Sequence, residues 1–112
     1  MPVRVAIVDD EVVVCRRLSQ ALSKDGYEVE AFTAGRSFLE RMQEQPFDVV
    51  FCDLMLPDLN GLDVLSEAKS IRRETEVIII TGYGSIESAI EAIKEGAHHY
   101  VTKPLKLAEV RL

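Results

Sequence analysis

The sequence predicts an α/β fold in which a five-stranded parallel sheet carries helices on both faces. Two observations support this. Five short apolar runs, typical of strands, alternate along the chain with segments whose apolar residues recur at helical spacing. No linker, repeat or low-complexity tract interrupts the alternation. Because strands that alternate with helices are joined by right-handed crossovers, the order βαβαβαβαβ predicts a doubly wound sheet.

The first half of the chain predicts three strands and two helices. The strands are expected over residues 3–8, 27–32 and 47–52, and the last of these is apolar except at Asp48. The first helix follows from Val14, Leu18 and Leu22, and Gly26 ends it. The second helix has its apolar face at residues 38, 39 and 42 and closes before Pro46.

The second half predicts two more strands and two more helices. A loop at residues 57–61 precedes a helix whose apolar residues are 62, 65, 68 and 71. The β-branched run 77–80 is the strongest strand signal in the chain. A helix over 86–93 follows, with Ser85 as its N-cap and Gly96 as its stop. The fifth strand covers 99–102, and a final helix begins at Leu107.

Length and charge bound the function. A chain of 112 residues fits one domain, which we expect to occupy 1–112. Its 19 acidic against 13 basic residues argue against binding nucleic acid or an anionic membrane surface. No apolar run approaches the roughly 20 residues of a membrane span, and we expect no signal peptide. Cys15 and Cys52 have neither metal nor disulfide-framework spacing, which is typical of reduced thiols in the cytoplasm.

Polar residues gather at the expected carboxyl ends of the strands, where open parallel sheets bind ligands. Asp9 and Asp10 follow the first strand, Asp53 the third, Thr81 the fourth and Lys103 the fifth. Taken singly, Asp10 fits a helix N-cap, Asp53 a loop acid and Lys103 a solvated charge. Together, however, three carboxylates repel one another unless a cation lies between them. The cluster therefore predicts a Mg²⁺ site, with the lysine beside it for an anionic group such as phosphate.

These residues belong to five motifs, and the chain resembles the receiver domain of a two-component response regulator. The five motifs follow one another in the order and spacing of that family. The resemblance covers essentially the whole chain and implies the flavodoxin-like strand order 2-1-3-4-5. The motifs are Val8-Asp9-Asp10-Glu11, Asp53-Leu54-Met55-Leu56-Pro57, Asn60-Gly61, Thr81-Gly82 and Tyr100-Val101-Thr102-Lys103-Pro104.

The resemblance implies a role for each matching residue. Asp53 corresponds to the phosphoacceptor. Asp9, Asp10, Asp53 and the backbone carbonyl of Met55 correspond to the Mg²⁺ ligands.

Five further residues also have implied or hypothetical roles. Thr81 corresponds to the switch hydroxyl, Lys103 to the cation that pairs with the phosphoryl oxygens, and Tyr100 to the aromatic that moves with Thr81. Pro104 corresponds to a cis-proline and, with Gly61, has a structural role.

The resemblance also implies partners. A sensor histidine kinase would donate the phosphoryl group, and phosphorylation would alter the surface of helix 86–93, strand 99–102 and the final helix. This surface would control the protein's own effector domain, which we expect outside this sequence, and it is a candidate homodimer interface. Residues 84–97 resemble receivers attached to enhancer-binding transcriptional regulators. Such a domain catalyses only its own phosphoryl transfer and dephosphorylation.

Other interpretations remain open at this stage. An aspartyl-phosphate phosphatase would usually carry Asp-x-Asp on its first strand, whereas this chain has adjacent Asp9 and Asp10. A flavin carrier would need a loop rich in glycine and hydroxyl groups after that strand. A degenerate receiver used only for docking would lack pocket residues. Tyr83 is hypothesised to hinder the hydrolytic water, against the alternative of an exposed loop tyrosine. Residues 107–112 are too few for a covering helix, so we expect the last helix to be incomplete.

Overall fold

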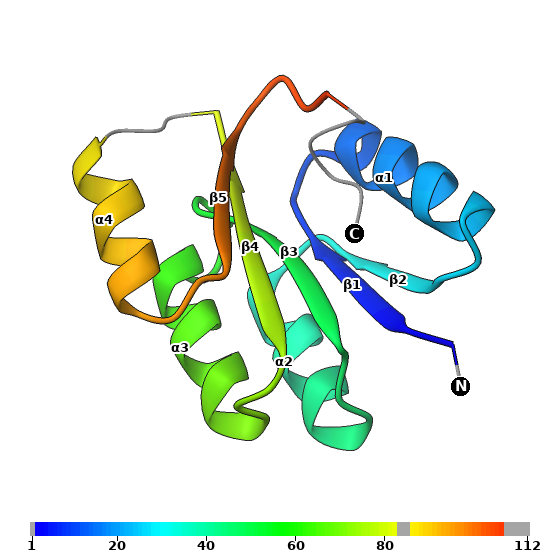
Figure 1. The fold of residues 1–112 in the computed structure, drawn as a ribbon, viewed down its shortest axis with the longest axis horizontal. Helices are drawn as coiled ribbons and strands as arrows, with labels where there is room; N and C mark the ends of the chain where they lie inside the picture. Colours follow the sequence, from blue (N-terminus) through cyan, green and yellow to red (C-terminus); the bar gives the residue numbers. More distant parts are fainter. Residues whose placement is uncertain (1, 83–85, 107–112) are drawn as a thin grey trace.

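The computed structural model describes residues 2–82 and 86–106 as a single five-stranded sheet flanked by helices (Figure 1). The strands are β1 (Arg4–Val8), β2 (Glu28–Phe32), β3 (Val49–Asp53), β4 (Glu76–Thr81) and β5 (His99–Thr102). The helices are α1 (Val12–Lys24), α2 (Gly35–Glu44), α3 (Gly61–Ile71) and α4 (Ile86–Lys94). The predictions for Ser85 and for residues 107–112 lie outside the described residues.

All strand pairings are parallel, and the strand order is β2-β1-β3-β4-β5, as predicted. The order reverses between β1 and β3, and a crevice forms at such a point beyond the strand ends. The register aligns Val8 with Cys52 and Asp53 with Ile80, so the carboxyl ends of the three central strands lie at one level.

Two core layers cover the sheet, one on each face. On one face α1 packs Cys15, Leu18 and Leu22 against the strands. On the other face α2, α3 and α4 pack against them, and the buried apolar side chains of these helices are Phe38, Leu39, Met42, Val64, Leu65, Ala68 and Ala92. β3 is buried throughout, which explains why its sequence is almost continuously apolar. The carboxyl ends of the strands therefore extend from a core that is packed on both faces of the sheet.

The C-terminal ends of α1 and α4 lie at the glycines that the sequence predicts, and the N-cap of α1 is a residue that the sequence did not single out. α1 and α4 both end before a glycine with positive φ, 93° at Gly26 and 104° at Gly96, which is a conformation that glycine adopts without strain. The N-cap of α1 is Glu11. Asp10 therefore does not have the N-cap role that it could have had on sequence grounds alone.

Candidate functional site

The residues singled out at the strand ends converge at one edge of the sheet. Asp9 directly follows β1, Asp53 is the last residue of β3, Thr81 is the last residue of β4, and Lys103 directly follows β5. In Figure 1 these strand ends all point to the same side of the molecule. Sequence positions up to 94 residues apart, from Asp9 to Lys103, are thus brought together by the parallel topology.

Three carboxylates form the centre of the site. Asp9, Asp10 and Asp53 each offer an oxygen, and these oxygens all lie within 4.8 Å of one another. Asp9 and Asp53 are buried, whereas Asp10 is exposed. Bringing like charges this close in a partly dry environment is unfavourable without a compensating cation. The arrangement is therefore more than a chance group of surface acids.

Lys103 supplies a positive charge to this cluster. Its Nζ lies 2.9 Å from Asp53 Oδ2, 3.0 Å from Asp9 Oδ2 and 2.6 Å from Glu11 Oε1. The lysine side chain is only 13% exposed. Burial opposes its charged form, but the hydrogen bonds to Glu11 and Asp53 and the ion pair with Asp9 outweigh burial and raise the pKa of Lys103. One ammonium faces three side-chain carboxylates, so the charge at the site stays negative.

Asp9 bears the electrostatic cost of this arrangement most clearly. Burial raises the pKa of Asp9, and the nearby charge of Asp53 adds to the rise, although hydrogen bonds from the Glu11 N–H and from Lys103 oppose it. Its Oδ1 accepts the backbone N–H of Glu11 at 2.8 Å. Its buried Oδ2 accepts no well-formed hydrogen bond from any residue in the described part of the chain. A buried carboxylate oxygen in this condition calls for a further partner.

The donor set fits a hard divalent cation such as Mg²⁺. Carboxylate oxygens with one side open to water are the ligands this ion prefers. The incompletely partnered Asp9 Oδ2, the exposed Asp10 and the carboxylate of Asp53 meet this description. The Oδ1 of Asp53 accepts the Met55 N–H at 3.1 Å, which fixes the Asp53 side chain relative to the loop that follows.

The loop between β3 and α3 has a shape that depends on Gly61. Met55 and Asn60 form an isolated antiparallel bridge, and the Gly61 N–H donates to the Leu54 carbonyl at 2.8 Å. A Cβ built at Gly61 would lie 2.6 Å from Leu54 Cα and would also overlap the backbone of Asp53. Only glycine fits here, so Gly61 sets the position of the backbone that carries Asp53.

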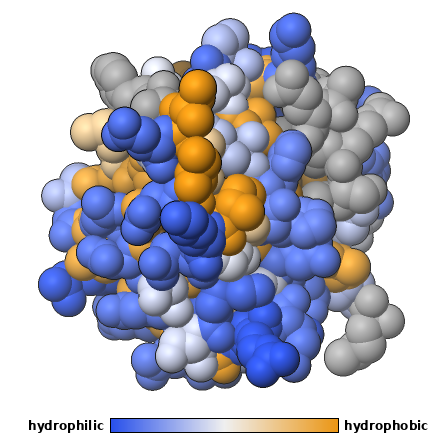
Figure 2. Space-filling view, turned by 60° about the vertical axis from the view of Figure 1, so that its left-hand side comes forward, coloured by the Kyte–Doolittle hydropathy of each residue, from blue (hydrophilic) through white to orange (hydrophobic). Residues whose placement is uncertain are grey.

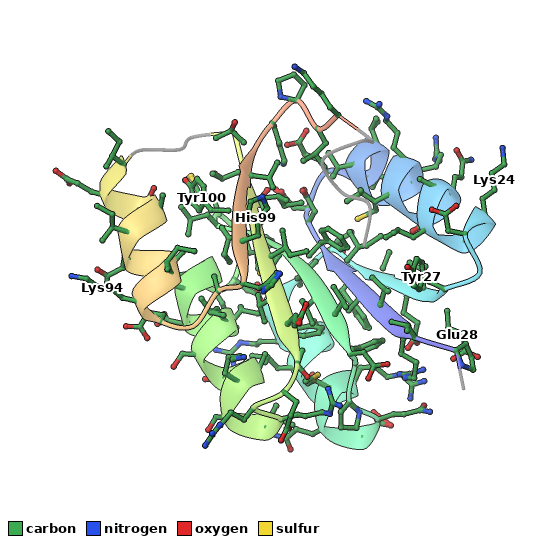
Figure 3. The ribbon with its side chains drawn as sticks, in the orientation of Figure 1. Lys24, Tyr27, Glu28, Lys94, His99 and Tyr100 are labelled. Carbon is green, nitrogen blue, oxygen red and sulfur yellow. The ribbon has the colours of Figure 1, made fainter. Side chains whose placement is uncertain are left out.

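The remaining predicted residues lie around this centre. Thr81 is buried, and its carbonyl accepts the Lys103 N–H at 2.8 Å. Tyr100 is half-buried between β5 and α4, where its hydroxyl lies 3.0 Å from Ser88 Oγ (Figure 3). The peptide bond between Lys103 and Pro104 is cis. Tyr83 lies outside the described residues.

Comparison with known proteins decides the family. The sequence model of the response regulator receiver domain family matches residues 5–112 of the chain. The chain belongs to the response regulator receiver domain family. It is 40% identical to the transcriptional regulatory protein ZraR of Escherichia coli K12 over 101 residues, and this aligned stretch covers 90% of this chain. The receiver domain spans only 23% of that relative's length.

Two solved receiver structures share the fold. One is a response regulator protein from Burkholderia pseudomallei with a phosphorylated aspartic acid, a calcium ion and citrate. It has a TM-score of 0.91 and 26% identity, covering 96% of this chain and 64% of the other. The other is the beryllofluoride-activated NtrC4 receiver domain dimer, with a TM-score of 0.90 and 33% identity. That match covers 95% of this receiver domain and 88% of the other chain.

Two side chains of the receiver domain matter more in the structure than in the sequence analysis. Glu11 makes the shortest contact with Lys103, and its place directly after Asp9 and Asp10 was the only signal that could have found it. Asp58 accepts the N–H groups of Gly35 and Arg36, each at 2.9 Å, and so joins the loop between β3 and α3 to the start of α2. The two hydrogen bonds of Asp58 join residues that are 23 and 22 positions apart, which is beyond the reach of local sequence patterns.

No helix within residues 2–82 and 86–106 of the receiver domain has the length and apolar character needed to cross a lipid bilayer.

Proposed function

We propose that this receiver domain is a phosphoacceptor switch and that Asp53 accepts a phosphoryl group from a sensor histidine kinase. The observation that carries the proposal is the contact of 2.9 Å between Asp53 Oδ2 and Lys103 Nζ within the carboxylate cluster. The phosphorylated aspartic acid of the Burkholderia pseudomallei relative supports it. The domain would work in the cytoplasm, where such a kinase presents its phosphohistidine.

The cation site would be formed by the carboxylates of Asp9, Asp10 and Asp53 and by the backbone carbonyl of Met55. When bound, Mg²⁺ would neutralise charge on the carboxylates and on the phosphoryl oxygens. The calcium ion in the Burkholderia pseudomallei relative is consistent with a divalent cation at such a domain.

The transfer itself needs one nucleophile and positioned charges. A carboxylate oxygen of Asp53 attacks phosphorus, the P–N bond of the phosphohistidine breaks, and the electron pair leaves with the imidazole, so that an acyl phosphate forms on Asp53. Lys103 pairs with the phosphoryl oxygens as charge moves onto them. The hydroxyl of Thr81 donates a hydrogen bond to one of these oxygens. Dephosphorylation by water regenerates the carboxylate, and the domain catalyses no other reaction.

The signal would leave the site through Thr81 and Tyr100. As Thr81 turns toward the phosphoryl group, Tyr100 exchanges its contact with Ser88 for an inward position, which alters the surface of α4 and β5. This surface exposes Ile86, Ile90 and Ile93, which are 80%, 50% and 51% exposed. Apolar side chains among hydrophilic ones are visible on the face that comes forward in Figure 2.

Exposed apolar side chains on one helix favour contact with another protein surface. We propose that the α4–β5 surface mediates homodimerisation and communicates with an effector domain that regulates transcription. The NtrC4 receiver dimer and the transcriptional role of ZraR support this part of the proposal. The alternative of an aspartyl-phosphate phosphatase receives no support from the family match.

The proposal is tested by intact-mass measurement after incubation with acetyl phosphate and Mg²⁺. Wild type should gain the mass of a single phosphoryl group, and Asp53→Asn should gain none. Asp63→Asn, which changes an exposed aspartate on α3, serves as the matched control and should be labelled like wild type. Equal labelling of wild type and Asp53→Asn would refute the assignment of Asp53.

A further inference from the structure

Glu11 is the closest partner of the lysine at the site. Its Oε1 lies 2.6 Å from Lys103 Nζ, compared with 2.9 Å for Asp53 and 3.0 Å for Asp9. A lysine ammonium has three N–H donors. Two of these donors are hydrogen-bonded to Glu11 and Asp53, and Asp9 Oδ2 lies at ion-pair distance, so a further anion must compete with carboxylates that already contact the ammonium.

The three carboxylates differ in how firmly they are held. The side chains of Asp9 and Asp53 are 0% and 6% exposed, and each also accepts a backbone N–H. Glu11 is 59% exposed, and although it is the N-cap residue of α1, its side chain makes no capping hydrogen bond. Of the three, Glu11 can leave at the least cost.

The surroundings give Glu11 somewhere to go. Together with Lys103 and Arg17 of α1, it lines a cavity of about 480 Å³. A rotation of its side chain into this space would move the carboxylate away from the ammonium and into a cavity that Arg17 also lines. The negative charge would then keep a cation nearby.

We propose that Glu11 is a positioning residue that holds Lys103 in the unphosphorylated domain and competes with the incoming phosphoryl group for its ammonium. This inference rests on the proposed function, since it concerns the step at which Lys103 turns to the phosphoryl oxygens on Asp53. Glu11 thereby slows phosphorylation, and its release frees the donor that the transferred group needs.

The first test measures the rate of phosphorylation by acetyl phosphate at saturating Mg²⁺. Glu11→Gln keeps the length of the side chain but removes its charge, and it should raise the rate by about two- to fivefold, the range of a partly exposed ion pair. Glu11→Asp retains the charge but shortens the reach, and should give a smaller increase. Glu40→Gln removes one exposed charge on α2 and should leave the rate unchanged.

The second test repeats the comparison in a Lys103→Met background. If Glu11 acts through the lysine, Glu11→Gln should have no effect on the rate once Lys103 is gone. An acceleration that persists in Lys103→Met would show that Glu11 merely repels the anionic donor, and the inference would be wrong.

A third measurement avoids covalent chemistry. The dissociation constant for beryllofluoride should fall by the same two- to fivefold in Glu11→Gln. If wild type is phosphorylated on Asp53 but Glu11→Gln is neither faster nor tighter for beryllofluoride, this inference alone fails. If wild type takes up no phosphoryl group, the proposed function and the inference fail together.

Discussion

The two ends of the sheet treat charge in opposite ways. At the carboxyl end, three aspartates and Glu11 surround one lysine, and no other cation of the described residues contacts their carboxylates. At the amino end, arginine side chains form ion pairs with acidic ones. The residues at this end are Arg4, Glu28, Glu30, Arg41, Asp48 and Arg72.

Arg4 organises the amino end. Its guanidinium lies 4.5 Å from the centre of the Phe47 ring and donates to Glu30 at 3.3 Å, while its backbone N–H donates to Asp48 at 2.8 Å. The hydroxyl of Thr75 donates to the Phe47 carbonyl at 2.6 Å and so satisfies a buried acceptor. These contacts join the starts of several strands.

The difference indicates that the two ends of the sheet have different roles. The amino end pairs its charges and contributes to stability. The carboxyl end keeps like charges together and leaves Asp9 Oδ2 incompletely partnered, which costs stability in the absence of a cation. Such a cost is expected where a protein binds a cation and an anion in turn.

The largest effect is expected at the loop between β3 and α3. Gly61→Ala should lower the free energy of unfolding by about 3 kcal/mol, because the new methyl group overlaps the backbone of Leu54 and Asp53. Chemical denaturation measures this loss. Gly82→Ala is the control, since among the described residues its Cβ would meet only Lys103 Cδ at 3.9 Å, and it should change stability by less than about 0.5 kcal/mol. Equal losses in the two variants would contradict the close packing at Gly61.

The next effect separates the two ends directly. Mg²⁺ at about 100 times its dissociation constant should raise the free energy of unfolding by about 2.7 kcal/mol. Asp9→Asn should lose most of this gain, because it removes a carboxylate that would bind the cation. Arg4→Met changes the amino end and should retain the whole gain. Thermal unfolding with Mg²⁺ and with a chelator provides the measurement, and a normal gain in Asp9→Asn would remove that residue from the cation site.

A smaller effect tests the amino end alone. Arg4→Met should lower the free energy of unfolding by about 1–2 kcal/mol, because it loses the stacking on Phe47 and the ion pair with Glu30. Arg16→Met, at an exposed position on α1, should stay within about 0.5 kcal/mol of wild type. Urea denaturation measures both variants. If Arg4→Met is no less stable than Arg16→Met, the amino end does not have the stabilising role described here.

The smallest effect is a pH dependence with opposite signs in two neighbouring loops. Burial raises the pKa of Asp9 above 3.8, so the folded state holds its proton more tightly, and this contribution to stability is lost as the pH rises through the raised pKa. The N–H groups of Arg36 and Gly35 lower the pKa of Asp58, so its contribution is present above 3.8 and is lost as the pH falls.

Stability measured against pH in metal-free buffer checks these signs. As the pH increases within the acidic range, Asp9→Asn should gain stability relative to wild type, and Asp58→Asn should lose stability relative to wild type. Parallel curves for the two variants would contradict the assigned causes of the shifts.

The fold and the centre of the site were predictable because the signals are local. Apolar runs and helical spacing are set by neighbouring residues, and parallel topology then brings Asp9, Asp53 and Lys103 together without further information. The family resemblance added the strand order, which the pairings confirm.

The contacts that the sequence analysis missed depend on side-chain conformation or on distant partners. The side chain of Glu11 could have pointed to solvent, and only the conformation of the Lys103 side chain in the folded site reveals their contact. Arg4 binds partners 26 to 44 residues away, and its choice among many acids depends on the completed sheet. Asp10 fitted an N-cap as well as a cation ligand, and the structure gives the N-cap position to Glu11.

We propose that the crowded carboxyl end of the sheet serves the phosphorylation of Asp53. The most direct test of this proposal is to treat the protein with acetyl phosphate and Mg²⁺, reduce the product with borohydride, and locate the modified residue by tandem mass spectrometry. Reduction of an aspartyl phosphate gives homoserine, and we expect homoserine at position 53. Homoserine at Asp9 or Asp10 instead, or at no position while the intact protein gains a phosphoryl group, would contradict it.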